Sequence, residues 1–154
     1  MKKLLVTMSV VAVVVLLLCV PSSQVTAAPG VSIKVMGLPG NKPLELEVGE
    51  SYTFEVIVKS DEPFISATAM TDAYYPGRGV FSHGSDRATQ DTSAVLYLTM
   101  TGKNSTADLP AVCDWPEPGD CWPEGIAPVS IVAGVRFPGG LAVGEQFPFA
   151  VVVP

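Results

Sequence analysis

The sequence predicts an all-β protein, folded as an antiparallel sandwich of about seven strands. From residue 28 onward, apolar and polar residues alternate with a period of two, and no apolar stripe has helical spacing. Fourteen glycines and fourteen prolines fall mainly between the short alternating segments. Many turns between short strands favour a sandwich over a parallel crossover fold, which needs long amphipathic segments between its strands.

The chain begins with a sequence that is typical of a secretory signal. Two lysines precede an apolar run over 4–20, and the polar stretch PSSQVTA follows. Val25 and Ala27 fit the small-x-small pattern, so we expect a signal peptide helix over 1–27 and cleavage before Ala28. An uncleaved anchor is the alternative, because the apolar run is near the low end of the ~17 to 25 residues that span a bilayer.

The charge of the remaining chain excludes one class of partner. Cleavage removes two of the nine basic residues and none of the fifteen acids, which leaves a net charge of −8. The other basic residues are scattered singly, whereas nucleic-acid binding needs lysines or arginines that displace counterions from phosphates. We therefore expect no nucleic-acid partner. Residues 28–154 have the usual length of one domain, and we predict a single secreted or cell-surface domain with no stable membrane span after signal removal.

The strands follow from the alternation in order along the chain. Val31, Ile33 and Val35 alternate with polar residues. Apolar residues also occupy alternate positions in the segments 44–48 and 52–58. The expected strands are 31–35, 44–48, 52–58, 65–73, 95–101, 129–136 and 147–153. The alternation in the first three places their apolar side chains on one face of a sheet, and the last four are each rich in β-branched or aromatic residues.

Two segments repeat a common pattern. LEVGESYTFEVIV (46–58) and LAVGEQFPFAVVV (141–153) share LxVGEx(Y/F)xFxVxV. We expect a turn at Gly49 or Gly144 and then a half-buried strand. With this motif the sequence resembles prokaryotic extracellular immunoglobulin-like and fibronectin-III-like modules. The resemblance implies an immunoglobulin-like sandwich, and such modules serve as spacers, adhesins, binding modules or filament subunits, so it selects no function.

The spacing of 95 residues between the two repeats equals about one immunoglobulin-like domain. Either both repeats belong to one sandwich, or the second begins a truncated domain. A single sandwich is favoured, because an unpaired final strand would expose Phe147, Phe149 and Val151. The final strand, or the segment near 31–35, could instead complete the sheet of a neighbouring molecule, as in strand-exchanged filaments.

The stretch CDWPEPGDCW (113–122) concentrates unusual residues. Cys113 and Cys121 are the only cysteines after signal removal, and in an oxidising compartment a disulfide is expected. Neither a CxxC redox motif nor four zinc ligands are present. The acids at 114, 117, 120 and 124 offer oxygen ligands for calcium, but their spacing is not that of an EF-hand, and solvated loop acids are the favoured interpretation. We expect no cofactor.

Four aromatic residues are candidates for binding. Trp115 and Trp122 stand beside prolines in this loop and could offer a flat face to a sugar ring or an apolar partner, or could cap the core. Tyr74 and Tyr75 pose the same question at a strand end. Asn104 begins a glycosylation sequon and marks an exposed turn.

The segment FSHGSD (81–86) contains Ser, His and Asp, but adjacent residues do not converge as a catalytic triad. We expect 76–93 to be an exposed loop and the protein not to be an enzyme. The sequence therefore predicts a secreted or cell-surface structural or binding module, with a protein partner, self-association or a polysaccharide ligand. The alternatives are a strand-exchanged filament subunit and a carbohydrate-binding module that uses Trp115 and Trp122.

Overall fold

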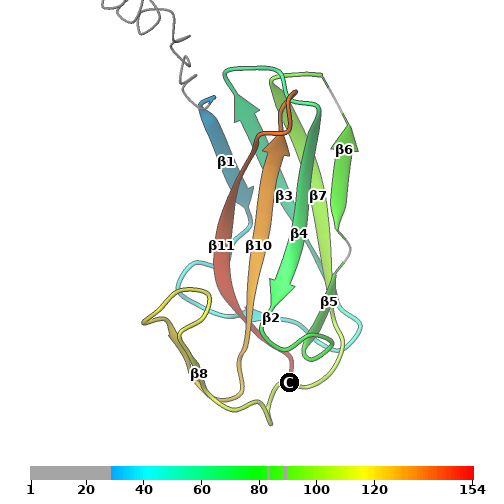
Figure 1. Cartoon of the computed structure of the whole chain (residues 1–154). Helices are drawn as coiled ribbons and strands as arrows, with labels where there is room; N and C mark the ends of the chain where they lie inside the picture. Colours follow the sequence, from blue (N-terminus) through cyan, green and yellow to red (C-terminus); the bar gives the residue numbers. More distant parts are fainter. Residues whose placement is uncertain (1–28, 83, 89) are drawn as a thin grey trace, which may run out of the picture.

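A computed structural model describes residues 29–82, 84–88 and 90–154 (Figure 1). The expected signal peptide over 1–27 and His83, the histidine of the FSHGSD segment, lie outside this part of the chain. Two β-sheets pack face to face, so the predicted all-β sandwich is confirmed. Within the described residues, no helix is long and apolar enough to cross a membrane.

The two main sheets contain nine strands. The first sheet has the order β1 (Val31–Met36), β3 (Ser51–Ser60), β7 (Ser93–Gly102) and β5 (Val80–Ser82). The second has the order β2 (Leu44–Glu45), β11 (Ala142–Val152), β10 (Ala127–Arg136), β4 (Ser66–Ala73) and β6 (Ser85–Ala88). A separate hairpin joins β8 (Val112–Cys113) to β9 (Cys121–Trp122).

This strand order is immunoglobulin-like. Strands β1, β3, β7 and β5 occupy the places of A, B, E and D, and β4, β10 and β11 occupy those of C, F and G, with antiparallel pairing between neighbours. The short β2 pairs in parallel with the end of β11. The B and F strands contain no cysteine, so the core lacks the inter-sheet disulfide of antibody domains and depends on packing.

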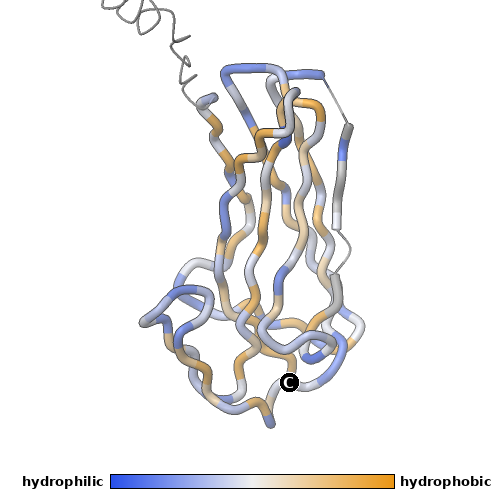
Figure 2. The backbone as a smooth tube through the Cα atoms, in the orientation of Figure 1, coloured by the Kyte–Doolittle hydropathy of each residue, from blue (hydrophilic) through white to orange (hydrophobic). Residues whose placement is uncertain are grey.

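The core lies between the two sheets. Phe54 on β3 and Phe149 on β11 hold the same place in the two sequence repeats, and their rings meet across the sandwich at 5.4 Å. Both are buried, as are Val129, the β10 partner of Phe149, and Ile131 on the same strand. Figure 2 shows apolar colour along the strands of both sheets and the most hydrophilic segments in the connections. Both repeats therefore belong to one sandwich.

Three local expectations were wrong. Gly144 lies inside β11 and not in a turn; the reversal before that strand occurs at Gly139 and Gly140, whose φ angles are 86° and 92°. Val48 is 62 % exposed, because the strand expected over 44–48 ends after two residues and a turn follows. The loop expected over 76–93 contains two short strands: β5 at the edge of the first sheet and β6 at the edge of the second.

The two segments that strand exchange would require are already paired within the chain, β1 with β3 and β11 with β10. Their open edges carry features that oppose further pairing. The Val152 carbonyl accepts a hydrogen bond from the N–H of Leu46, the residue after β2. The even-numbered residues of β11 therefore direct their backbone groups away from β10, toward the open edge. Pro148 lies in that row without an N–H, and Lys34 places a charge in the middle of β1.

Candidate functional site

The connections at the end of the sandwich that carries the C-terminus hold the predicted aromatic residues. Here β4 runs into the turn that leads to β5, and the long connection from β7 to β10 carries the β8–β9 hairpin (Figure 1). The connections at the opposite end, 61–65, 89–92 and 137–141, are shorter. The chemistry-bearing side chains therefore gather at one end of the fold.

The hairpin is held to the body of the sandwich from within. Leu109 and Val112 are buried, and the Leu109 carbonyl accepts a hydrogen bond from the N–H of Gly125, at 2.9 Å. Thr106, fully buried, donates its hydroxyl to the Gly125 carbonyl at 2.7 Å and accepts from the N–H of Val153 at 3.1 Å. The two ends of the connection are thus held to each other, and its start is held to the residue that follows β11.

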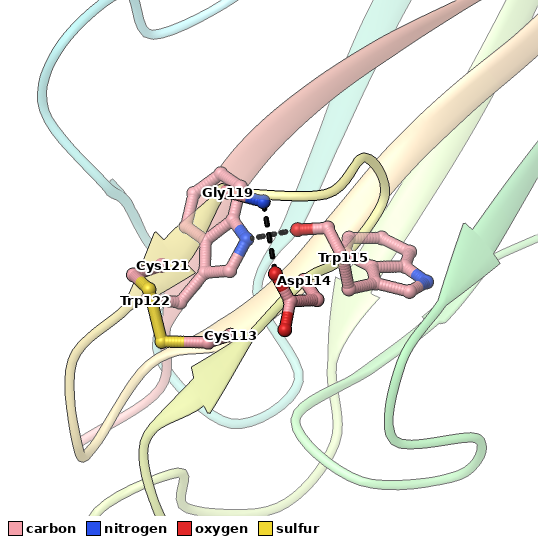
Figure 3. Close-up of a disulfide and its surroundings, with 6 residues drawn as sticks. All are labelled: Cys113, Asp114, Trp115, Gly119, Cys121 and Trp122. Atoms are coloured by element: carbon pink, nitrogen blue, oxygen red, sulfur yellow. Dashed lines mark hydrogen bonds between the residues drawn. A yellow bond between two sulfur atoms is a disulfide. The ribbon is translucent and has the colours of Figure 1, made fainter.

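Cys113 and Cys121 form the expected disulfide and face each other across the two strands of the hairpin (Figure 3). Between them, the N–H of Asp114 donates to the Asp120 carbonyl at 2.7 Å, and its carboxylate accepts from the N–H of Gly119 at 2.9 Å. Asp114 has a φ of 61°, a left-handed conformation that aspartate tolerates better than most residues. The loop is closed covalently and by its own hydrogen bonds.

The two tryptophans of the hairpin have different roles. The indole N–H of Trp122 donates to the Trp115 carbonyl at 2.6 Å, and Figure 3 shows the two rings pointing to opposite sides of the loop. Trp122 therefore braces the backbone of the residue that precedes the two prolines, and it does not stand beside the Trp115 ring. Both indoles are half-buried.

Trp115 instead approaches Tyr74, at 6.0 Å between ring centroids, and Tyr74 lies 4.8 Å from Tyr75. We call these three residues the aromatic corner. Tyr75 anchors it, because its hydroxyl donates to the Pro110 carbonyl and its ring packs against the core. Tyr74 is 43 % exposed and is the ring most available to a ligand. The corner thus joins the end of β4 to the disulfide hairpin.

The rings of the corner are nearly perpendicular, at 84° for the two tyrosines and 74° for Tyr74 and Trp115. Coplanar rings, which form a flat platform for an extended polysaccharide, are not present. Neither indole belongs to the buried core cluster, and capping of the core by these half-buried rings stays a prediction. Each ring of the corner is therefore set edge-on to its neighbour.

The surroundings of the corner are acidic. The connection over 103–126 contains five acids and one base, Lys103. Arg78 neutralises one of the acids, because its guanidinium donates to the Asp108 carboxylate at 2.6 Å and thereby lowers the pKa of Asp108 below its ordinary value of 3.8. The other four acids lie in or just beyond the hairpin, so the field at the corner is negative.

The remaining predicted residues are the candidate calcium ligands of the hairpin and Asn104. Among the described residues, no group of three or more acids, histidines or cysteines is arranged to hold a metal ion, and Asp114 is engaged by Gly119. Asn104 is exposed just after β7, and its amide donates to the Gly77 carbonyl. Sequence reasoning missed the pairing of Tyr74 with Trp115 and the role of buried Thr106, which is also the third residue of the sequon.

Comparison with known proteins adds a likeness of fold. No protein-family model matches the chain, and no curated protein is similar to it in sequence. Among solved structures, the chain is similar to the BIgI domain of the beta protein of S. agalactiae, determined bound to CEACAM1. The TM-score is 0.37 at 13 % identity, over 81 % of this chain and 99 % of that one. At this level the likeness identifies neither a family nor a function, and the immunoglobulin-like assignment stands on the strand order.

Proposed function

We propose that the protein is an extracellular, non-catalytic binding module that holds its partner at the aromatic corner. The observation that carries this proposal is the construction of the corner. An exposed Tyr74 ring is set against Trp115 on a hairpin that a disulfide and a set of hydrogen bonds hold in place. Rigid aromatic anchors bind at a small cost in conformational entropy.

The chemistry of the corner favours a neutral or cationic group. A lysine or arginine over the face of Tyr74 or Trp115 is attracted by the ring and also by the acids of the 103–126 connection. A sulfated or uronic acid glycan is repelled by the same acids. The preferred partner is therefore a protein surface that presents a basic side chain beside an apolar one.

A neutral sugar is the second candidate, because one exposed ring can stack on one sugar face. The perpendicular rings favour a chain end or a single residue over a flat polysaccharide surface. This revises the pair expected from the sequence, since Tyr74 and not Trp122 stands beside Trp115.

Two further observations support an exported, non-catalytic role. The disulfide suits an oxidising compartment, as does the signal-like N-terminus. The Arg78 guanidinium lowers the pKa of Asp108 through an exposed ion pair, which holds this carboxyl in its ionised form. A proton-transfer group needs a pKa near the working pH.

The test uses the exported protein on arrays of defined peptides and of neutral, amino and anionic glycans. We expect retention on basic peptides or neutral sugars and none on anionic glycans. Tyr74→Ala and Trp115→Ala should each weaken retention by about tenfold or more, the size of a hot-spot loss. The matched control is Tyr97→Ala, which removes a tyrosine that is 62 % exposed on the other sheet. Retention that both corner variants leave unchanged would contradict the proposal.

A further inference from the structure

We propose that the outer face of the second sheet is a self-association surface through which two copies of this chain pair about a two-fold axis. The face is formed by side chains of β4 and β10 and by the neighbouring part of β11. A groove of about 660 Å³ lies over it, lined among others by Thr68, Met70, Val132 and Gly134. It lies on the flank of the sandwich, apart from the aromatic corner at its end.

The groove results from a row of large apolar side chains that lies next to a row of glycines. Odd-numbered residues of β10 point into the core, so its even-numbered residues line the outer face. Val132 is paired with Met70, which is 48 % exposed, and together they form a raised apolar row. The next row contains Gly134 and Gly144, paired with each other. A Cβ on Gly134 would lie 2.7 Å from the Val143 carbonyl oxygen, so close strand packing keeps this hollow free of side chains.

Opposite charges stand at the two ends of the same face. Asp72 on β4 is the cross-strand partner of Ser130 on β10, and Arg136 lies six residues further along β10. Asp72 and Arg136 are therefore separated by on the order of 20 Å along the strand direction. Both side chains are exposed, and neither takes part in an ion pair in the part of the chain that the structure describes. They are too far apart to pair within one copy.

Consider a two-fold axis that runs across the strands, between the row of Met70 and Val132 and the row of Gly134 and Gly144. It matches both the charges and the shape of the face in the second copy. It places Asp72 of each copy over Arg136 of the other. It also lays Met70 and Val132 of each copy over the row of Thr68, Gly134 and Gly144. The face is thus complementary to itself in charge and in shape, as a closed isologous interface requires, which is why we assign it to a second copy. Because the face is small and only partly apolar, the association is weak and reversible.

The experiment measures the mass of the exported protein by sedimentation equilibrium over about 1 μM to 1 mM, a range that covers weak interfaces. We expect a monomer–dimer equilibrium that shifts toward monomer as salt is raised, since exposed ion pairs are screened. Arg136→Asp or Asp72→Arg should weaken dimerisation by about tenfold. The double variant Asp72→Arg with Arg136→Asp should restore it.

The double variant makes the test decisive, because rescue can arise only from contact between copies. Met70→Ala should also weaken the dimer, whereas Tyr97→Ala on the other sheet and Tyr74→Ala at the aromatic corner should leave it unchanged. A monomer at all concentrations overturns the proposal. So does a dimer that the charge reversals do not affect, or one that Tyr97→Ala or Tyr74→Ala abolishes. Since ligand retention is a separate readout, failure here is distinguishable from failure of the proposed function.

Discussion

Thr106 is the residue at which one small change should disturb the loop end most. Its side chain is fully buried, its hydroxyl donates to the Gly125 carbonyl at 2.7 Å and accepts from the N–H of Val153 at 3.1 Å, and its backbone N–H donates to the Val153 carbonyl at 2.8 Å. Thr106→Val keeps almost the same shape and removes only the hydroxyl. We predict that this variant folds but is markedly less stable.

The magnitude follows from the groups left behind. Val153 is buried, so its N–H loses its partner without access to water, which costs about 1 to 3 kcal/mol. The Gly125 carbonyl is only half-buried, and the loss of its bond costs about 0.5 to 1.5 kcal/mol. The total of about 1.5 to 4.5 kcal/mol corresponds to a fall in Tm on the order of 10 °C for a domain of this size.

The assay is reversible denaturation of wild type, Thr106→Val and Thr106→Ser. The serine variant keeps the hydroxyl and loses a methyl group packed near Gly79, which should cost about 1 kcal/mol. Asn104→Gln separates any effect of the sequon from that of the hydroxyl. If Thr106→Val is within about 0.5 kcal/mol of wild type, the ordinary range for neutral surface changes, or if serine is as damaging as valine, the hydrogen-bonded role is refuted.

Three further predictions concern other parts of the molecule. Replacing Cys113 and Cys121 by serine should lower the free energy of unfolding by about 2 to 3 kcal/mol, because the unfolded chain gains conformational entropy without the disulfide. Reductant should lower the stability of the wild type by the same amount. Equal denaturation curves for the oxidised wild type and the serine variant would contradict this prediction. Because Arg78 lowers the pKa of Asp108, the stability that Asp108 contributes is present above pH 3.8 and is lost as the pH falls through the lower folded value; an NMR titration of Asp108 at or above 3.8 would contradict this. Pro148→Val restores an N–H at the open edge of β11 and should promote large assemblies, seen by light scattering, whereas a particle size equal to that of wild type would contradict the edge-protection role.

The sequence predicted the sandwich because burial repeats locally. In the segment 52–58, alternate residues face the core, and Phe54, Val56 and Val58 are buried where the pattern placed them. The same pattern could not predict where strands begin. Val48 and Gly144 belong to the same repeated motif, yet one lies in a turn and the other inside a strand, because pairing with distant strands decides the boundary.

The candidate site was only partly predictable. The cysteine spacing indicated the disulfide, and the composition of the hairpin drew attention to its two tryptophans. Their different roles depend on tertiary structure: the Trp122 indole is directed to a backbone carbonyl, and the partner of Trp115 is Tyr74, 41 residues earlier in the chain. Thr106 gave no local sign of burial, because its partners Gly125 and Val153 lie far along the sequence.

The most direct test of the account is an NMR titration that follows the two indole N–H signals while the ligand that the arrays retain most strongly is added. The Trp122 indole N–H is hydrogen-bonded inside the hairpin, whereas the Trp115 ring belongs to the aromatic corner. We predict that the Trp115 indole and the Tyr74 ring signals shift together and saturate, while the Trp122 indole moves little. Shifts confined to the sheet faces, or no shift at Tyr74 and Trp115, would contradict recognition at the corner.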